Sequence, residues 1–323
     1  AGMDLYSIGE MVIDFIPGEE PGSYLRNAGG APANVACAVA KNGLVAGMLC
    51  SIGEDDFGHF LADTLQENGV RRLNPDFCAE AITTMAFVTL DESGDRSFTF
   101  ARKPGADMFL SEAQVKEEEI RDSVIVHAGS CSLSASPVAE ATVKAMRLAH
   151  EFGKLVSFDV NYRNLMWNDD VDACVKKVFE CLPYIDVLKI SEEELDMMGG
   201  AENLPKLMKE YGISLIVLTL GGDGAKCYYQ DQVFAVPGRK AVCVDATGAG
   251  DAFWGGFLSC LRLLKVETAE DLSEEIIRKA MKYGNVSGWI CVQKKGGISS
   301  LPTREQILEV LRQEGDGDAY HLG

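Results

Sequence analysis

Three small residues, Gly248, Ala249 and Gly250, come directly before Asp251, where the pattern predicts that a helix begins. Small residues let a ligand approach the backbone closely, and a helix N-terminus offers unpaired N–H groups to an anion such as phosphate. A carboxylate beside a bound phosphate repels it unless the carboxylate takes part in the reaction. Its natural task is to accept the proton of a hydroxyl that attacks the phosphorus. The segment therefore predicts a phosphate cradle with a base, which is what a kinase for alcohols requires.

Two simpler interpretations of this segment stay open at this point. A carboxylate in the first turn also stabilises the helix dipole, by about 0.3–1 kcal/mol. A tight turn between a strand and a helix explains the glycines, but it does not explain the adjacent carboxylate of Asp251.

Composition limits the class of protein. The chain has 323 residues, of which 47% are hydrophobic and 24% charged, which predicts one large α/β domain, alone or with a small appendage. The formal net charge of −19 argues against bulk binding of nucleic acid or of an anionic membrane. A local positive site for a small anion is still allowed.

The ten cysteines include no Cys-x-x-Cys pair and lie within apolar stretches, so we expect buried free thiols in a reducing compartment. The beginning of the chain carries Asp4 and Glu10 and has no basic region, so no signal peptide is expected. No apolar run reaches the length of a membrane span. These features predict a cytoplasmic protein.

Apolar runs of strand length alternate with amphipathic helical segments, which predicts a mostly parallel sheet covered by helices on both faces. In such sheets ligands bind at the carboxyl ends of the strands. Strands are predicted at 5–9, 45–52, 124–128, 156–160, 187–190 and 215–220, with two antiparallel strands between 225 and 244. Helices are predicted at 31–42, 57–68, 137–152, 171–181, 202–211, 249–264, 274–292 and 303–313.

Two segments, at about 11–27 and 83–106, alternate in character and have no crossover helix between their strands. A hairpin turn is predicted at 91–95. We interpret these segments as a small separate sheet, a lid that excludes water from the site; an ordinary edge hairpin is the alternative. The kinase domain is then 1–313, with a frayed tail at 314–323.

Two motifs resemble the signatures of the PfkB, or ribokinase-like, carbohydrate kinases. The segment Asn27-Ala28-Gly29-Gly30-Ala31-Pro32-Ala33-Asn34 is similar to the N-terminal signature, and residues 245–256 are similar to the C-terminal one. The resemblance covers about residues 3–312. It implies a three-layer α/β/α fold, doubly wound, with a mostly parallel sheet and a small β-sheet lid.

Within the family the resemblance is strongest to fructokinases, through residues 8–17, 100–108 and 159–163. Ribokinases proper usually carry Lys-Gly where this chain has Ala31-Pro32. The implied reaction is ATP-dependent phosphorylation of a primary hydroxyl, D-fructose to fructose 6-phosphate. A 2-keto-3-deoxygluconate kinase or another PfkB sugar kinase is the alternative, followed by a non-catalytic sugar-binding homologue. The intact base and glycine cradle favour an enzyme.

The resemblance also implies roles for individual residues. Asp251 is the base, and Gly248, Ala249 and Gly250 form the anion hole. In the keto-acid kinases, arginines at similar places bind the substrate carboxylate, so Arg102 and Arg163 do not distinguish fructose from ketodeoxygluconate. The alternative role for both arginines is a surface salt bridge. The alternative for Asp14 is a solvated position at a strand end. The residues expected around the sugar are Asp14, Gly29, Gly30, Asn34, Phe100, Arg102, Asn161 and Arg163.

ATP and Mg²⁺ are the implied cofactors. Glu194 matches the end of the family's Asn-x-x-Glu motif, but Ser191 replaces the Asn, and Ser-x-x-Glu is also a helix capping box. The chain has no Gly-x₄-Gly-Lys-Ser/Thr loop, so it is not a P-loop enzyme. The residues expected around the nucleotide are Lys189, Glu194, Thr219, Gly221, Gly222, Gly224 and Asn285.

Family members often hold a monovalent cation near the cradle. Asp245, Thr247, Gly296 and Ser300 match positions that supply oxygen atoms there, so K⁺ is a further expected ion. The expected partners are a small sugar and ATP, with no nucleic acid and no membrane. Lid sheets pair to form dimers in many relatives, so a homodimer through the lid is one option for the oligomeric state.

Overall fold

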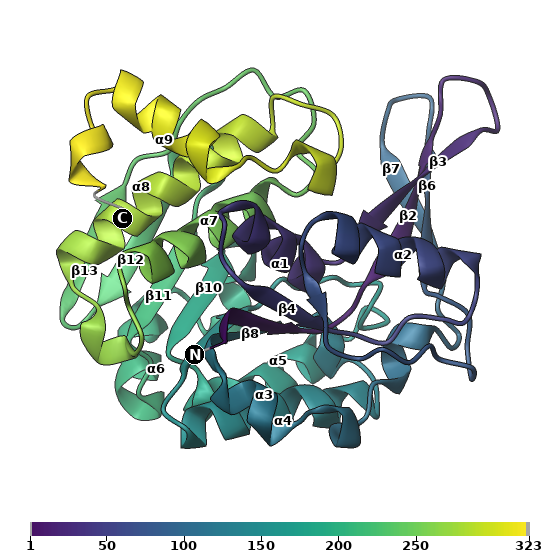
Figure 1. Ribbon diagram of the computed structural model, residues 1–323, viewed down its shortest axis with the longest axis horizontal. Helices are drawn as coiled ribbons and strands as arrows, with labels where there is room; N and C mark the ends of the chain where they lie inside the picture. Colours follow the sequence, from purple (N-terminus) through teal and green to yellow (C-terminus); the bar gives the residue numbers. More distant parts are fainter. Residues whose placement is uncertain (1, 321–323) are drawn as a thin grey trace.

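The computed structural model describes residues 2–320 and contains two separate sheets (Figure 1). The large sheet has nine strands in the order β13-β12-β11-β10-β9-β8-β1-β4-β5. Its neighbouring strands are parallel except for β11 with β12 and β12 with β13, which are antiparallel. The strands are β1 (Met3–Ile8), β4 (Ala46–Leu49), β5 (Arg71–Arg72), β8 (Ser123–Gly129), β9 (Leu155–Asp159), β10 (Val187–Ser191), β11 (Leu215–Thr219), β12 (Ala225–Tyr229) and β13 (Gln232–Val236).

Helices cover both faces of this sheet, so the predicted three-layer α/β/α fold is confirmed. Successive strand residues alternate between two cores: Leu5 contacts one and Tyr6 the other. The first core includes α1 (Ala31–Lys41), α2 (Asp56–Glu67), α7 (Ala249–Leu263), α8 (Glu274–Cys291) and α9 (Arg304–Gln313). The second includes α3 (Glu117–Arg121), α4 (Val138–Glu151), α5 (Val171–Cys181) and α6 (Leu204–Tyr211).

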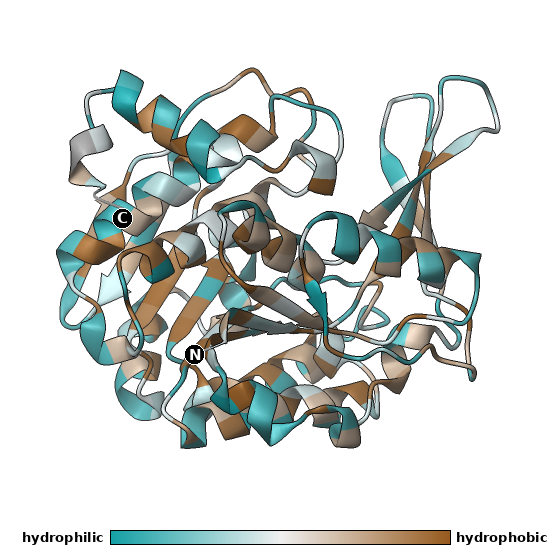
Figure 2. Cartoon of the chain, viewed as in Figure 1, coloured by the Kyte–Doolittle hydropathy of each residue, from teal (hydrophilic) through white to brown (hydrophobic). Residues whose placement is uncertain are grey.

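Hydropathy follows this layering. Strands of the large sheet are mainly hydrophobic, while the helices alternate hydrophobic and hydrophilic residues (Figure 2). Each helix thus has an apolar side to set against the sheet. The carboxyl ends of the parallel strands β1, β8, β9, β10 and β11 lie at one edge of the sheet, where the predicted site residues follow them.

The small sheet has four strands in the order β3-β2-β6-β7 and projects from the main body at the upper right of Figure 1. Its strands are β2 (Val12–Pro17), β3 (Tyr24–Gly29), β6 (Met85–Leu90) and β7 (Arg96–Ala101). One face packs on α2, where the rings of Phe15 and Phe57 lie 5.4 Å apart. The register places Asp14 beside Ala86, and Ala86 beside Phe100, on the other face. The predicted separate lid sheet is confirmed, and the alternative of an edge hairpin is wrong.

Some expected boundaries are wrong. The last antiparallel strand ends at Val236 rather than near Val244, because Pro237 has no N–H to donate to a sheet. Residues 237–248 form neither helix nor strand, and they include Cys243, the exposed exception among ten free cysteines, of which nine are buried as expected. The short elements β5 and α3 were not predicted, since they contain too few residues for a periodic pattern.

The C-terminal segment is ordered as far as the structure describes it. The Tyr320 hydroxyl donates a hydrogen bond of 2.9 Å to the carbonyl of Lys279 on α8, and Tyr320 is buried. Asp316 pairs with Lys282. The expectation that this end frays is therefore wrong for residues 314–320, because an aromatic residue anchors it; residues 321–323 lie outside the described part.

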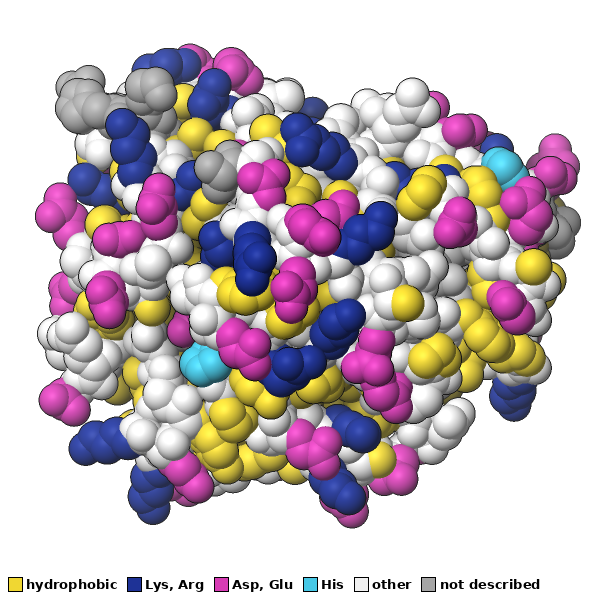
Figure 3. Space-filling view, turned by 60° about the horizontal axis from the view of Figure 1, so that its bottom comes forward, with side chains coloured by type: hydrophobic (Ala, Val, Ile, Leu, Met, Phe, Trp, Pro, Cys, Tyr) yellow, Lys and Arg dark blue, Asp and Glu magenta, His cyan; other side chains and the backbone are white. Residues whose placement is uncertain are grey.

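Charged side chains of both signs are spread over the surface of the molecule shown in Figure 3. Lys and Arg are interspersed with Asp and Glu on the face shown in Figure 3, so the described residues form no continuous basic surface there. Among residues 2–320 no helix is long and apolar enough to cross a membrane.

Candidate active site

The three small residues predicted to form the phosphate cradle lie at the start of α7. Gly248 precedes the helix with φ 77°, a left-handed conformation that suits glycine. The Ala249 N–H donates to the carbonyl of Ala246 at 3.1 Å, which closes the turn. Because the first N–H groups of a helix have no partner within it, those of Gly250 and Asp251 remain to face an anion. Ala249 thus shapes the cradle through its turn.

Asp251 stands in the first turn of α7 and contacts the N-terminal motif directly. The side-chain amide of Asn34, on α1, donates a hydrogen bond of 2.9 Å to Asp251 Oδ2. Burial raises the pKa of Asp251 to about 6, although the Asn34 hydrogen bond acts in the opposite direction. This contact joins residues 217 positions apart, so the two signature motifs form one site. A carboxyl group with a pKa of about 6 suits the role of general base that is expected for Asp251.

The sugar side of the site is built on the turn between β3 and α1. Gly30 has φ 107°, and a Cβ atom there would lie 2.5 Å from the carbonyl oxygen of Glu10. A Cβ atom on Gly29 would lie 2.3 Å from Asp14 Oδ2. Burial raises the pKa of Asp14 to about 6. Asn34 Oδ1 is buried and has no partner among the described residues, so this corner offers acceptors to hydroxyl groups.

Arg102 lies beside this corner in a buried ion pair, not in a surface one. Its guanidinium donates to Asp107 through Nε and Nη2, the latter at 3.0 Å, and the two side chains are 8% and 0% exposed. Further bonds go to Ser134 Oγ and to the carbonyl of Met166. Arg102 thus ties the end of β7 to the main body. Phe100, half-buried, is two residues earlier on that strand.

Asn161 and Arg163 follow the carboxyl end of β9. Asn161 has φ 39°, uncommon for a residue with a side chain, and its carbonyl accepts a hydrogen bond from Ser130. Arg163 is exposed, and its charge lowers the pKa of Asp251, so it acts on the cradle across space. The alternative of a surface salt bridge is not supported for Arg163, because its Nη1 donates a hydrogen bond to the carbonyl of Tyr162 instead.

The expected nucleotide residues follow β10 and β11. Gly221 has φ 60°, and Cβ atoms on Gly221 and Gly222 would meet no atom within 4 Å. Residues 219–222 therefore form an open stretch of backbone after β11, which we call the ledge. Gly224 is required for packing, because a Cβ atom there would lie 2.1 Å from the Val236 carbonyl. On α8, Asn285 Nδ2 donates to the Pro237 carbonyl at 3.1 Å.

The contacts of Glu194 support the capping-box interpretation, while its expected role at Mg²⁺ stays a prediction. Oε1 accepts from the Ser191 N–H at 3.0 Å, as in a capping box, while Oε2 accepts from the Tyr162 N–H at 2.7 Å. Burial raises the pKa of this carboxyl group. Glu194 therefore connects the start of the segment after β10 with the loop after β9. Lys189, on β10, pairs with Asp159 at 3.0 Å.

The four residues expected around a cation do come together. Asp245 Oδ1 accepts from the Thr247 N–H at 2.9 Å, and Oδ2 accepts from the Gly296 N–H at 3.0 Å. The Ser300 hydroxyl contacts the Gly296 carbonyl, and it lies 2.8 Å from the carbonyl of Gly297. Although burial alone would raise the pKa of Asp245, these hydrogen bonds hold it below its usual value. The group is rich in oxygen atoms beside the cradle.

Sequence reasoning gave no role to Asp159 or Glu10. Asp159 is the countercharge of Lys189, and its position at the carboxyl end of a buried strand was the available signal. Glu10 is buried, and burial raises its pKa to about 8. No described residue bonds its Oε1 atom. Its place directly after β1 was the signal there.

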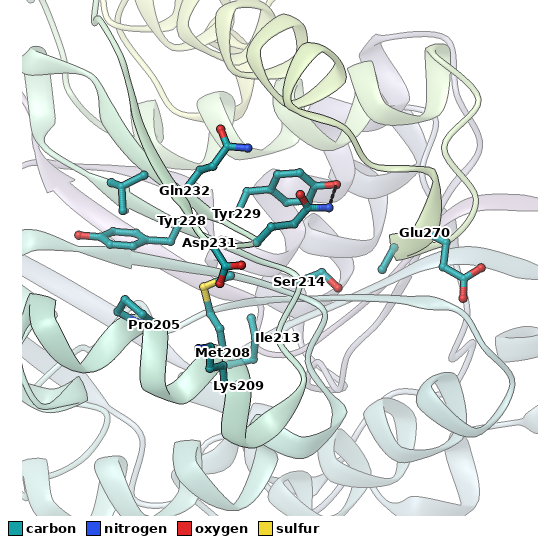
Figure 4. A pocket seen from close by; sticks show the side chains of 13 residues that line it. Pro205, Met208, Lys209, Ile213, Ser214, Tyr228, Tyr229, Asp231, Gln232 and Glu270 are labelled. Atoms are coloured by element: carbon teal, nitrogen blue, oxygen red, sulfur yellow. Dashed lines mark hydrogen bonds between the residues drawn. The ribbon is translucent and has the colours of Figure 1, made fainter.

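A separate cavity lies far from these residues, where Ser214 precedes β11 and Tyr229–Gln232 turn between β12 and β13 (Figure 4). It is at the amino end of β11, opposite the carboxyl edge. None of the predicted site residues lines it.

Comparison with known proteins agrees with the geometry. Residues 3–304 match the model of the pfkB family carbohydrate kinases. Fructokinase-1 of Oryza sativa subsp. japonica is 39% identical over 316 residues, covering 94% of this chain and 96% of the relative. Among solved structures, a fructokinase from Xylella fastidiosa with bound ATP is 30% identical, with a TM-score of 0.88 over 98% of this chain and 100% of the other.

A fructokinase from Vibrio cholerae O395, solved with fructose, ADP and calcium, is 31% identical, with a TM-score of 0.83 over 96% of this chain and 99% of the other. A double mutant described for the same organism has fructose, ADP and potassium bound, with 32% identity, a TM-score of 0.83 and coverage of 96% and 98%. The family match spans nearly the whole chain, and the cradle, base and lid agree with it. The chain belongs to the pfkB family of carbohydrate kinases.

Proposed function

We propose that this enzyme transfers the γ-phosphoryl group of ATP to a primary hydroxyl of D-fructose, forming fructose 6-phosphate and ADP. One observation carries the proposal: the Asn34–Asp251 hydrogen bond brings the sugar turn and the phosphate cradle into one site. The similar fructokinases with ATP, or with fructose and ADP, support this choice of substrates.

The reaction needs one proton transfer and one phosphoryl transfer. Asp251 accepts the hydroxyl proton while the sugar oxygen forms a bond to the γ-phosphorus, and the bond from that phosphorus to the bridging oxygen of ADP breaks. The N–H groups at the start of α7 balance the charge on the phosphoryl oxygens. Asn34 orients the carboxylate through its hydrogen bond. The lid would exclude water, which competes with the sugar as acceptor.

Sugar recognition is assigned to acceptors on both sides of the turn. Asp14 and Asn34 Oδ1 accept hydrogen bonds from hydroxyl groups, and Gly29 and Gly30 let the sugar lie against the backbone. Phe100, Asn161 and Arg163 complete the expected sugar set, and Arg102 acts through the lid that it anchors.

The nucleotide is assigned to the ledge after β11, with Thr219, Gly221 and Gly222 on one side and Asn285 on the other. Mg²⁺ would neutralise charge on the phosphate oxygens when bound. Glu194 fits contact with it through water, since both carboxylate oxygens already accept backbone N–H groups and keep free lone pairs.

A monovalent cation such as K⁺ would be held by oxygens of Asp245, Thr247, Gly296 and Ser300. The donor set fits, because it consists of carbonyl, hydroxyl and carboxylate oxygens, which hard cations prefer. We expect activity to be several-fold higher in KCl than in tetramethylammonium chloride, and the melting temperature to rise only with K⁺. Steady-state rates and thermal scans of the same sample measure both, and equal values in the two salts would contradict the proposal.

A homodimer through the lid is supported by exposed apolar side chains on the face of the small sheet that also carries Asp14. Leu25, Leu90 and Phe98 are 64%, 49% and 46% exposed. We expect Phe98→Asp to convert dimers to monomers at micromolar concentration in sedimentation velocity. Val233→Asp, an equally exposed site on β13, is the matched control that should leave the dimer intact. A wild-type protein that sediments as a monomer would refute the dimer.

A cytoplasmic location is also proposed. Free thiols at all ten cysteines are typical of a reducing compartment, and cell fractionation tests this assignment.

The substrate assignment is tested by ADP release with fructose, ribose, 2-keto-3-deoxygluconate, tagatose phosphate and nucleosides at equal concentrations. We expect the highest kcat/KM with fructose. A higher value with ketodeoxygluconate would instead assign Arg163 to its carboxylate, and no ADP release with any acceptor would favour a non-catalytic homologue.

A further inference from the structure

Asp159, the last residue of β9, and Lys189, in the middle of the neighbouring strand β10, form a buried ion pair. They are paired in the register of β9 and β10, with Lys189 Nζ 3.0 Å from Asp159 Oδ2. Their side chains are 4% and 11% exposed. Removing two charges from water costs several kcal/mol per ion, so a buried pair is weak as a source of stability. Its presence at this edge of the sheet therefore calls for another explanation.

The pair lies directly against the cradle. Apart from its chain neighbours and the backbone of its own helix, the only atom of the described residues within 4 Å of a Cβ atom placed on Gly250 is Lys189 Nζ, at 3.9 Å. Gly250 immediately precedes Asp251, so the ammonium group stands beside the first turn of α7. The pair also lies close enough to Glu194 and His127 to affect them: Asp159 raises the pKa of both groups, and Lys189 lowers it.

We propose that the Asp159–Lys189 pair positions the charge of the catalytic base: Lys189 holds Asp251 in its ionised form, and Asp159 holds the ammonium group in place. This inference rests on the proposed kinase function and adds to it two residues that need not touch either substrate. Lys189 is then a positioning residue, and Asp159, which fixes the ammonium group, also offsets part of its charge at Asp251.

The balance of charge supports this role. Asp159, Glu194 and Asp251 are three carboxyl groups around one ammonium group. Burial alone would lower the pKa of Lys189, but the three carboxylates raise it above its ordinary value, so the ammonium stays charged. A permanent positive charge next to Asp251 favours the carboxylate that must accept a proton from the sugar.

The two members act on Asp251 with opposite sign. Burial raises the pKa of Asp251 most; Asp159 raises it further, whereas Lys189 and Arg163 lower it. Its other neighbours are Asn34, which donates a hydrogen bond from α1, Glu10 after β1, and Cys291 on α8. Because Asp159 and Lys189 differ in sign, removing each one alone gives a different result.

The test compares Lys189→Met, Asp159→Asn and the double variant with the wild type. We expect the acid limb of the kcat profile to move up by about one pH unit in Lys189→Met and down in Asp159→Asn. The double variant, in which no buried charge is left unpaired, should fold well and fall between the two. Lys177→Met, an exposed lysine paired with Glu180 on α5, is the matched control and should not shift the limb.

A second readout does not depend on turnover. The ¹³C carboxyl signal of Asp251, assigned by its loss in Asp251→Asn, should titrate with the same opposite shifts. If the wild type has no kinase activity but the Asp251 signal still shifts in opposite directions in the two single variants, the proposed function is refuted and the electrostatic part of the inference remains. Two outcomes would overturn the inference and leave the kinase function intact. One is a shift of the same sign in both single variants. The other is no shift in any of the three variants, with the double variant shown to be folded.

Discussion

Replacing Asp251 with Asn is expected to lower kcat about 10²–10⁴-fold, the typical contribution of a general base. Asparagine keeps the shape of the side chain and an oxygen that accepts the Asn34 hydrogen bond, but it cannot accept the sugar proton. Nucleotide binding should survive, because the N–H groups of the cradle belong to the backbone. Turnover by ADP release and the ATP dissociation constant by calorimetry check both parts.

The role of Asp251 as the base also predicts how the kcat of the wild type depends on pH. Because the pKa of Asp251 is raised to about 6, the base is protonated below this pH and ionised above it. The kcat of the wild type should therefore fall as the pH drops through about 6. Asp231→Asn, in the β12–β13 turn outside the site, is the control and should retain both rate and profile. Turnover near the wild-type rate in Asp251→Asn would remove this residue from the mechanism.

The parts of the fold that the sequence predicted are those with a local pattern. Strands such as 187–190 and helices such as 171–181 are continuous periodic runs, and their lengths were predicted to within a residue or two. The motifs that contain Asn34 and Asp251 were both identified from the sequence, but the hydrogen bond between the two side chains was not predicted. Residues 237–244 were misassigned as part of a strand, since an apolar stretch there resembles a strand but follows Pro237.

The parts that could not be predicted depend on side chains that meet across the fold. Arg102 was expected at the substrate, yet its guanidinium binds Asp107, five residues later in a buried turn. Asp159 and Lys189 are 30 positions apart, and only the register of β9 with β10 makes them partners. A single sequence gives the residue types at a strand end, but the pairing of charges there depends on strand order.

Gly30→Ala is expected to lower kcat/KM for fructose strongly, although the substitution adds only one methyl group. The new Cβ atom would lie 2.5 Å from the backbone carbonyl of Glu10, and φ 107° is a conformation that alanine rarely adopts. Because the backbone carbonyl cannot rotate out of the way, the turn that leads into α1 must move, and Asn34 on α1 moves with it. A displacement of about 1 Å at a substrate-positioning group can cost about 10² in rate. We expect kcat/KM for fructose to fall about 10²-fold.

The matched control separates this contact from the cost of the backbone conformation. Gly22, in the β2–β3 turn of the lid, also has positive φ, 83°, but a Cβ atom there would meet nothing within 4 Å. Both alanine variants should lose about 1–3 kcal/mol of unfolding free energy in urea, whereas only Gly30→Ala should lose activity. If Gly22→Ala lost fructose turnover to the same extent, the close approach of Gly30 to Glu10 could not be the cause. If neither lost it, the sugar would have to lie away from this turn.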